Sequence, residues 1–85
     1  MQLDILTPEK KIYSGNVYGI QLPGISGSFE ILDKHAPMVS ALGKGNMKLL
    51  MDKSGNNAIR YDVSGGFIEV LDNKVTVLVE SAIEK

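Results

Sequence analysis

The feature that most limits the folds open to this chain is an alternation of apolar residues with a period of two. Ile59, Tyr61 and Val63 alternate with Arg60 and Asp62, and the same spacing occurs in segments 2–6, 18–22, 47–51 and 75–79. Successive side chains of a β-strand point to opposite faces, so this spacing places one set of apolar groups in a core. The sequence therefore predicts strands in these segments.

Glycine, proline and Asn/Asp clusters separate these segments. Nine glycines and three prolines leave stretches that are mostly too short for a helix. Residues 52–57 and Asp72-Asn73 predict hairpin loops, because Asn and Asp accept the positive φ of tight turns. The valines of 67–80 favour strand over helix, whereas 81–85 are compatible with the start of a helix. We predict one all-β domain over residues 1–85, of the sandwich or small-barrel type.

Composition excludes several classes of function. Ten acidic and nine basic residues give a net charge of −1 with no block of like charge, which argues against nucleic-acid binding and against an electrostatic membrane anchor. The absence of cysteine excludes disulfides, thiolate zinc sites and thiol nucleophiles. The N-terminal residues lack the pattern of a signal peptide, and no apolar run is long enough to insert in a membrane, so we expect a cytoplasmic protein.

Several strands carry apolar residues on both faces. Leu6, Leu50 and Leu78 lie opposite the apolar set of their own segments. In a thin two-layer domain the second face should be solvated. Isolated surface leucines are ordinary, but a protein-binding face would give the same pattern, and the sequence leaves both explanations open.

No residue pattern predicts a catalytic, metal or cofactor site. The lone His35 could form a triad with Asp33 and Ser28 or Ser64 only by a spatial arrangement that the spacing does not indicate. One histidine without cysteines does not make a zinc site, so a structural or interface histidine is the better interpretation.

Two glycine-rich segments are interpreted as structural. The loop 22–28 lacks the lysine and helix of a phosphate-binding loop, and Glu30 follows where phosphate would be repelled. We expect a tight connection between strands there. Gly65 and Gly66 interrupt a strand and predict a bulge or the close approach of another backbone.

Lys48 gives an alternative function. Biotinyl and lipoyl carrier domains are small all-β domains with a modified lysine beside methionine at a hairpin tip, and Lys48 follows Met47. The nearest turn signal is at 54–55, which instead predicts Lys48 in the middle of a strand.

Five segments in order, 3–9 with 13–15, 23–27 with 31–32, 35–42, 63–70 and 75–78, carry a family resemblance across nearly the whole chain. With their His-Ala-Pro, Ser-Gly-Gly and Val-Thr-Val-Leu runs, they resemble the N-terminal domain of the epsilon subunit of bacterial F-type ATP synthases. The resemblance implies a flattened ten-stranded β-sandwich of two five-stranded sheets. It also implies a non-catalytic central-stalk subunit, without metal or cofactor, that couples ion-driven rotation to ATP synthesis.

The same resemblance implies two partners and the residues that face them. Segment 35–42 matches a region facing the gamma subunit; the residues expected there are His35, Met38, Ser40 and Leu42. Segment 27–31 matches the loop facing the c-ring; the residues expected there are Ser28, Phe29 and Glu30. Ser28 occupies the position where the family usually has an acid, and Glu30 follows two residues later. The implied location is the cytoplasmic face of the bacterial inner membrane, peripheral and without membrane insertion.

Family members commonly continue into a C-terminal helical hairpin that inhibits ATP hydrolysis and in some members binds ATP. Residues 81–85 lie where that hairpin would begin. A protein of this length is therefore expected to show neither hairpin-type inhibition nor ATP binding, and modification of Lys48 in a carrier domain remains the alternative function.

Overall fold

The computed structural model describes all 85 residues, Met1–Lys85, and every regular element in it is a strand. The strands are β1 (Gln2–Leu6), β2 (Lys11–Asn16), β3 (Gly19–Gly24), β4 (Gly27–Leu32), β5 (Met38–Leu50), β6 (Ala58–Leu71), β7 (Lys74–Val79) and β8 (Ala82–Glu84). The prediction of an all-β domain is confirmed. No helix in the structure has the length and apolar character needed to span a membrane.

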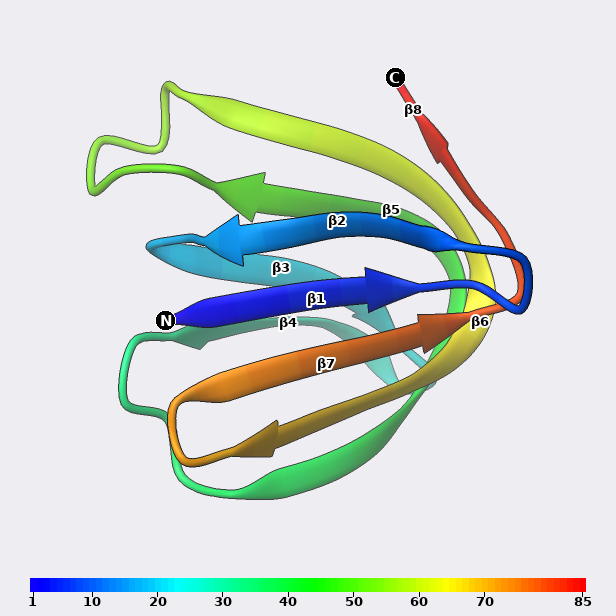
Figure 1. The fold of residues 1–85 in the computed structure, drawn as a ribbon, viewed down its shortest axis with the longest axis horizontal. Coiled ribbons are helices and arrows are strands. Elements are labelled where there is room, and N and C mark those ends of the chain that lie inside the picture. Colours follow the sequence, from blue (N-terminus) through cyan, green and yellow to red (C-terminus); the bar gives the residue numbers. More distant parts are fainter.

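The eight strands form one hydrogen-bonded sheet that folds over into two layers (Figure 1). The strand order is β2-β1-β7-β6-β5-β3-β4, and β8 pairs with β6 outside this path. Only β1 and β7 pair in parallel. The long strands β5 and β6, of 13 and 14 residues, bend together and run through both layers. Each layer thus has five strand segments. The structure has eight continuous strands where the family resemblance implies ten, because β5 and β6 each contribute a segment to both layers.

We call the layers by their strands. The first layer contains β2, β1, β7, the second half of β6 and the first half of β5. The second layer contains β8, the first half of β6, the second half of β5, β3 and β4.

Glycine permits the bend in β6. Gly65 and Gly66 have φ values of +106° and +149°, a backbone conformation that residues with a side chain rarely adopt. A Cβ on Gly66 would lie 1.9 Å from the carbonyl oxygen of Leu78 on β7. The predicted close approach of another backbone is therefore confirmed, and β7 sets the constraint.

The core lies between the layers and is wholly apolar. It comprises a cluster of 16 buried hydrophobic residues, and no polar or charged side chain is buried. In the first layer, Ile5 pairs with Val77, and Val77 pairs with Ile68, so adjacent strands present their inward residues side by side. Leu50, expected on a second face, is instead buried at 7% exposure.

The turns follow the sequence signals, but the C-terminal segment does not. Asp72 and Asn73 have φ values of +51° and +60°, as a tight hairpin between β6 and β7 requires. Residues 52–57 connect β5 to β6, and the predicted tight connection at 22–28 is the β3–β4 hairpin. Residues 81–85, which by sequence were also compatible with the start of a helix, instead contain β8. This strand pairs with Tyr61–Val63 of β6, whose edge would otherwise leave backbone groups unpaired.

Candidate protein-binding surface

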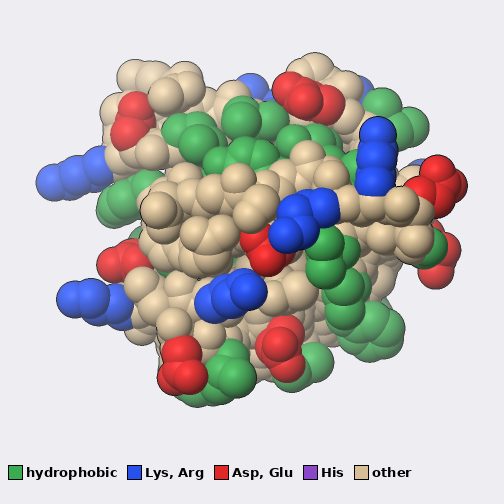
Figure 2. Space-filling view, in the orientation of Figure 1, with side chains coloured by type: hydrophobic (Ala, Val, Ile, Leu, Met, Phe, Trp, Pro, Cys, Tyr) green, Lys and Arg blue, Asp and Glu red, His purple; other side chains and the backbone are tan.

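An apolar row crosses four strands on the outer face of the first layer. Leu6 of β1 is paired with Leu78 of β7, Leu78 with Phe67 of β6, and Phe67 with Ala41 of β5. Phe67 is 58% exposed and Leu78 is 49% exposed. The space-filling view shows hydrophobic side chains gathered over the ends of β1 and β7 (Figure 2). We call these four residues the apolar row.

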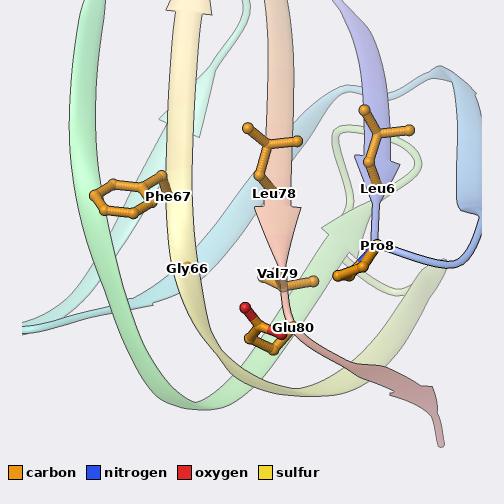
Figure 3. Close-up of a pocket in the computed structure, with 7 residues that line it drawn as sticks. All are labelled: Leu6, Pro8, Gly66, Phe67, Leu78, Val79 and Glu80. Carbon is orange, nitrogen blue, oxygen red and sulfur yellow. The ribbon is translucent and has the colours of Figure 1, made fainter.

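The position of the row follows from strand alternation. Ile68 and Val77 are fully buried, so their neighbours Phe67 and Leu78 must point outward. Figure 3 shows Leu6, Leu78 and Phe67 on three adjacent strands. Aromatic and aliphatic cross-strand neighbours on one face stabilise a sheet, yet this face remains open to solvent.

A shallow hollow lies beside the row. Its volume is about 300 Å³, and it is lined by Leu6, Pro8, Gly66, Phe67, Leu78, Val79 and Glu80. Val39, 70% exposed, and Leu71, 52% exposed, extend the exposed apolar area of β5 and β6. Large exposed apolar side chains gathered on one face in this way are typical of protein-binding sites.

Polar groups border the apolar row. Two residues along each strand, on the same face, Asp4 pairs with Thr76, and Thr76 pairs with Glu69. The hydroxyl of Ser14 donates to Asp4 Oδ1 at 2.7 Å, and Lys74 Nζ lies 3.5 Å from Asp4 Oδ2. The hydrogen bond from Ser14 is the main cause that lowers the pKa of Asp4. An apolar centre with a charged rim is the usual anatomy of a protein interface.

The residues expected to face the gamma subunit lie beside this surface, but most point away from it. Leu42 is buried at 5% exposure, and Met38 and Ser40 are half-buried on the same face of β5. Val39 and Ala41, the alternate residues, carry the outward positions. Strand alternation along β5 is the sequence signal that points to Val39 and Ala41 as the outward residues.

His35 lies exposed in the loop between β4 and β5. Its Nδ1 is 2.8 Å from the carbonyl oxygen of Ala36, a local contact. The hypothetical triad partners are engaged elsewhere: Asn73 donates to Asp33, and Ser81 donates to Ser64. The structure therefore does not assemble a triad around His35.

The residues expected to face the c-ring belong to the β3–β4 hairpin. Ser28 is exposed, Phe29 packs against the core, and Glu30 accepts a hydrogen bond from Gln21 Nε2 at 3.0 Å. The two-residue tip carries Ile25, which is 72% exposed and which no sequence pattern distinguishes from the other residues of the hairpin.

The two predicted surfaces meet at one place. A hollow of about 400 Å³ is lined by residues 24–29 of the hairpin and by Ser40 and Ala41 of β5. The hairpin tip and the start of β5 therefore form one continuous edge of the molecule.

Lys48 lies within β5, paired with Gln21 on one side and with Arg60 on the other. A carrier domain needs its lysine at a hairpin tip, free to reach successive active sites. The structure therefore gives no support to the carrier hypothesis.

Comparison with known proteins places this chain in a family. Residues 1–85 match the family model described as "ATP synthase, Delta/Epsilon chain, beta-sandwich domain". The chain is 41% identical over 87 residues to the ATP synthase epsilon chain of Salinibacter ruber, covering 95% of this chain and 58% of that one. The epsilon chain of Maridesulfovibrio salexigens is 48% identical, with 94% and 54% covered. The chain thus spans little more than half the length of these relatives.

The epsilon chain of Chlorobium limicola is 42% identical, with 93% of this chain and 88% of that one covered. Among solved structures, a chain of the Euglena gracilis mitochondrial ATP synthase (OSCP/F1/c-ring, rotational state 1) has the same fold, with a TM-score of 0.87 at 24% identity over 96% of this chain and 51% of that one. A chain from the central stalk and c-ring of the Tetrahymena thermophila enzyme gives a TM-score of 0.75 at 20% identity, covering 96% and 64%. By its sequence and its fold, the chain belongs to the delta/epsilon-chain family of ATP synthases and represents the family's β-sandwich domain.

Proposed function

We propose that this chain is a non-catalytic subunit of the ATP synthase rotor, which binds the gamma subunit and the c-ring and couples ion-driven rotation to ATP synthesis. In a bacterial cell it would lie at the cytoplasmic face of the inner membrane, held there by the complex. Family membership supports the assembly, and the relatives carry the name ATP synthase epsilon chain.

The single observation that carries the proposal is the apolar row with its polar rim. Leu6, Leu78, Phe67 and Ala41 are in register across four strands, so a partner can cover them as one surface. Large apolar side chains at the centre of an interface dominate its binding energy, and the rim mainly excludes water. We assign this face to the gamma subunit, together with the adjoining segment 35–41, which leads into β5 and forms its start.

The β3–β4 hairpin is assigned to the c-ring. Its tip projects an exposed apolar residue, Ile25, beside the exposed Ser28. Glu30 lies further down the hairpin, and its hydrogen bond from Gln21 orients the carboxylate. A short, rigid hairpin of this kind suits contact with the polar loops of a ring, because a two-residue turn leaves little freedom at the tip.

Binding to gamma tests the proposal directly. We expect Phe67→Ser with Leu78→Ser to weaken binding about thirtyfold or more, since two anchors of about 1–2 kcal/mol each are lost. Ile83→Ser is the matched control, because Ile83 is 67% exposed but lies on β8 in the second layer. The measurement is calorimetric titration of the purified chain into an ATP synthase F1 complex that lacks this subunit. Unchanged affinity of the double variant would remove the apolar row from the interface.

Cross-linking tests the contact with the c-ring. The chain has no cysteine, so Ser28→Cys introduces a single thiol at the hairpin. We expect oxidation to link it to cysteines placed in the polar loops of the c-ring in the assembled enzyme, whereas Ser54→Cys in the β5–β6 loop gives no such product. Equal yields from both positions would contradict the assignment of the hairpin.

A further inference from the structure

The loop that carries His35, Ala36 and Pro37 is held by side chains that do not belong to the predicted interface. Asn73 Nδ2 in the β6–β7 turn donates to Asp33 Oδ1 at 2.9 Å. The backbone N–H of Lys34 donates to Asn73 Oδ1 at 2.7 Å. Figure 1 shows the β4–β5 loop and the β6–β7 turn side by side, near the N-terminus.

The amino group of Met1 completes this contact. Its nitrogen lies 3.1 Å from Asp33 Oδ1 and donates to the carbonyl of Val17 at 3.0 Å. The hydrogen bond from Asn73 is the first cause that lowers the pKa of Asp33, and the bond from the amino group is the second. Asp33 is therefore ionised at neutral pH and accepts from two donors. We call Asp33 and Asn73 the latch.

The latch holds a backbone conformation that the sequence does not favour. Lys34 has a φ of +62°, a left-handed conformation that is unfavourable for a lysine because its Cβ crowds the following carbonyl oxygen. Asn73 is itself left-handed, with a φ of +60°, which asparagine tolerates. A strained residue persists where its surroundings fix it, and the side chain of Asn73 is what fixes the amide of Lys34.

Both ends of the loop are attached to the same hairpin. At one end Asp33 and Lys34 bind Asn73, and at the other end Met38 pairs with Val70 of β6. Between these anchors the only hydrogen bond made by a side chain of the loop is the local contact of His35. The shape of the segment 35–37 is therefore set by the β6–β7 hairpin.

We propose that Asp33 and Asn73 are positioning residues, which hold the His35–Pro37 bend in the conformation that binds the gamma subunit. The inference rests on the proposed function. It assigns to these two residues an effect on affinity without contact with the partner. If the bend adopts the conformation that binds gamma only part of the time, the apparent dissociation constant rises in inverse proportion to the fraction of molecules in that conformation.

The test combines two variants with a matched control. Asp33→Ala removes the acceptor, and Asn73→Gly removes the side chain while keeping a residue that accepts positive φ. Asp72→Asn is the control, since it removes one negative charge in the same turn and its side chain makes no hydrogen bond or ion pair. The exchange Asp33→Asn with Asn73→Asp keeps the charge and a donor–acceptor pair between the two positions.

Two measurements separate the latch from the partner. Amide hydrogen exchange of the free chain by NMR reports on the bend, and we expect the Lys34 amide to exchange at least tenfold faster in the two single variants. Titration against the F1 complex should show about tenfold weaker binding for the same variants. The control should match the wild type in both measurements, and the exchanged pair should recover most of each loss.

Each outcome decides a different claim. Faster exchange with unchanged affinity would overturn the positioning role. Unchanged exchange at Lys34 would overturn the latch itself. Failure of the wild-type chain to bind would refute the proposed function, and the exchange data would then still decide whether the latch holds the bend.

Discussion

Replacing Gly66 by alanine tests the bend on which the two-layer fold depends. The new Cβ would lie 1.9 Å from the carbonyl oxygen of Leu78, whereas a carbon atom normally stays about 3.3 Å or more from such an oxygen. The obstacle is backbone, so no side-chain rotation relieves it. To restore a separation of about 3.3 Å, either strand β7 must move by more than about 1 Å relative to β6, or the bend must open.

The cost of the substitution has two parts. A non-glycine residue at a φ of +149° costs about 1–3 kcal/mol. Displacing β7 weakens the pairing of Gly66 with Val79 and its neighbours, at about 0.5–1.5 kcal/mol for each hydrogen bond. We expect a total loss of about 3–5 kcal/mol. A domain of this size has roughly 4–13 kcal/mol of stability, so the variant should be marginally folded.

Two other glycines separate these parts. Gly27 has a φ of +130° but no atom within 4 Å of its added Cβ, so Gly27→Ala carries the conformational cost alone. Gly43 has no positive φ, and the nearest atom to its Cβ is at 3.6 Å, an ordinary contact. We expect a loss of about 1–2 kcal/mol for Gly27→Ala and less than about 0.5 kcal/mol for Gly43→Ala.

Urea unfolding followed by far-ultraviolet circular dichroism measures all three variants, since the chain has no tryptophan for fluorescence. The free energies are comparable if the slopes with urea are equal. If Gly66→Ala loses a free energy of unfolding within about 1 kcal/mol of the loss for Gly27→Ala, the claim that contact with β7 fixes the bend is refuted.

Three further predictions follow from burial and ionisation. Leu42→Ala should lower the free energy of unfolding by about 2–4 kcal/mol, and Val39→Ala by less than about 0.5, in urea titrations; similar losses would contradict the alternation of β5. Burial, followed by the charge of Glu84, raises the pKa of Tyr61. The stability that comes from this shift is therefore fully present below about pH 10 and is lost as the pH rises further. The free energy of unfolding of Tyr61→Phe should fall less between about pH 9 and 11 than that of the wild type. The pKa of Asp4 is lowered, chiefly by the hydrogen bond from Ser14. The wild type should therefore have a higher free energy of unfolding than Asp4→Asn above about pH 4, and this difference should vanish as the pH falls further. An equal difference at about pH 2 and pH 7 would contradict the prediction.

Strand alternation and turn chemistry made much of the fold predictable. The hairpin at Asp72-Asn73 and the glycine constraint at Gly66 each follow from a local rule of backbone conformation. The strand at 82–84 was not predicted, because no local signal shows that the edge of β6 is open to a further strand. Likewise, the burial of Leu50 depends on the second layer and not on its own segment.

The candidate surface was predicted less well than the fold. The family resemblance points to a segment of β5 that lies beside the apolar row, and the β5 residues that it selects alternate with those that point outward. Phe67 was not singled out, because its exposure depends on which face of β6 meets the core. The row itself joins strands far apart in the sequence, and its register appears only when β1, β7, β6 and β5 are placed side by side.

The continuity of β5 and β6 through both layers has a mechanical consequence. In a sandwich of two separate sheets, sliding one sheet over the other disturbs only side-chain packing. Here the same displacement would have to stretch two polypeptide backbones that cross between the layers at the glycine bend. A load applied at the β3–β4 hairpin in one layer is therefore passed to the apolar row in the other through covalent bonds and strand pairing, and the domain should respond to shear as a single stiff body.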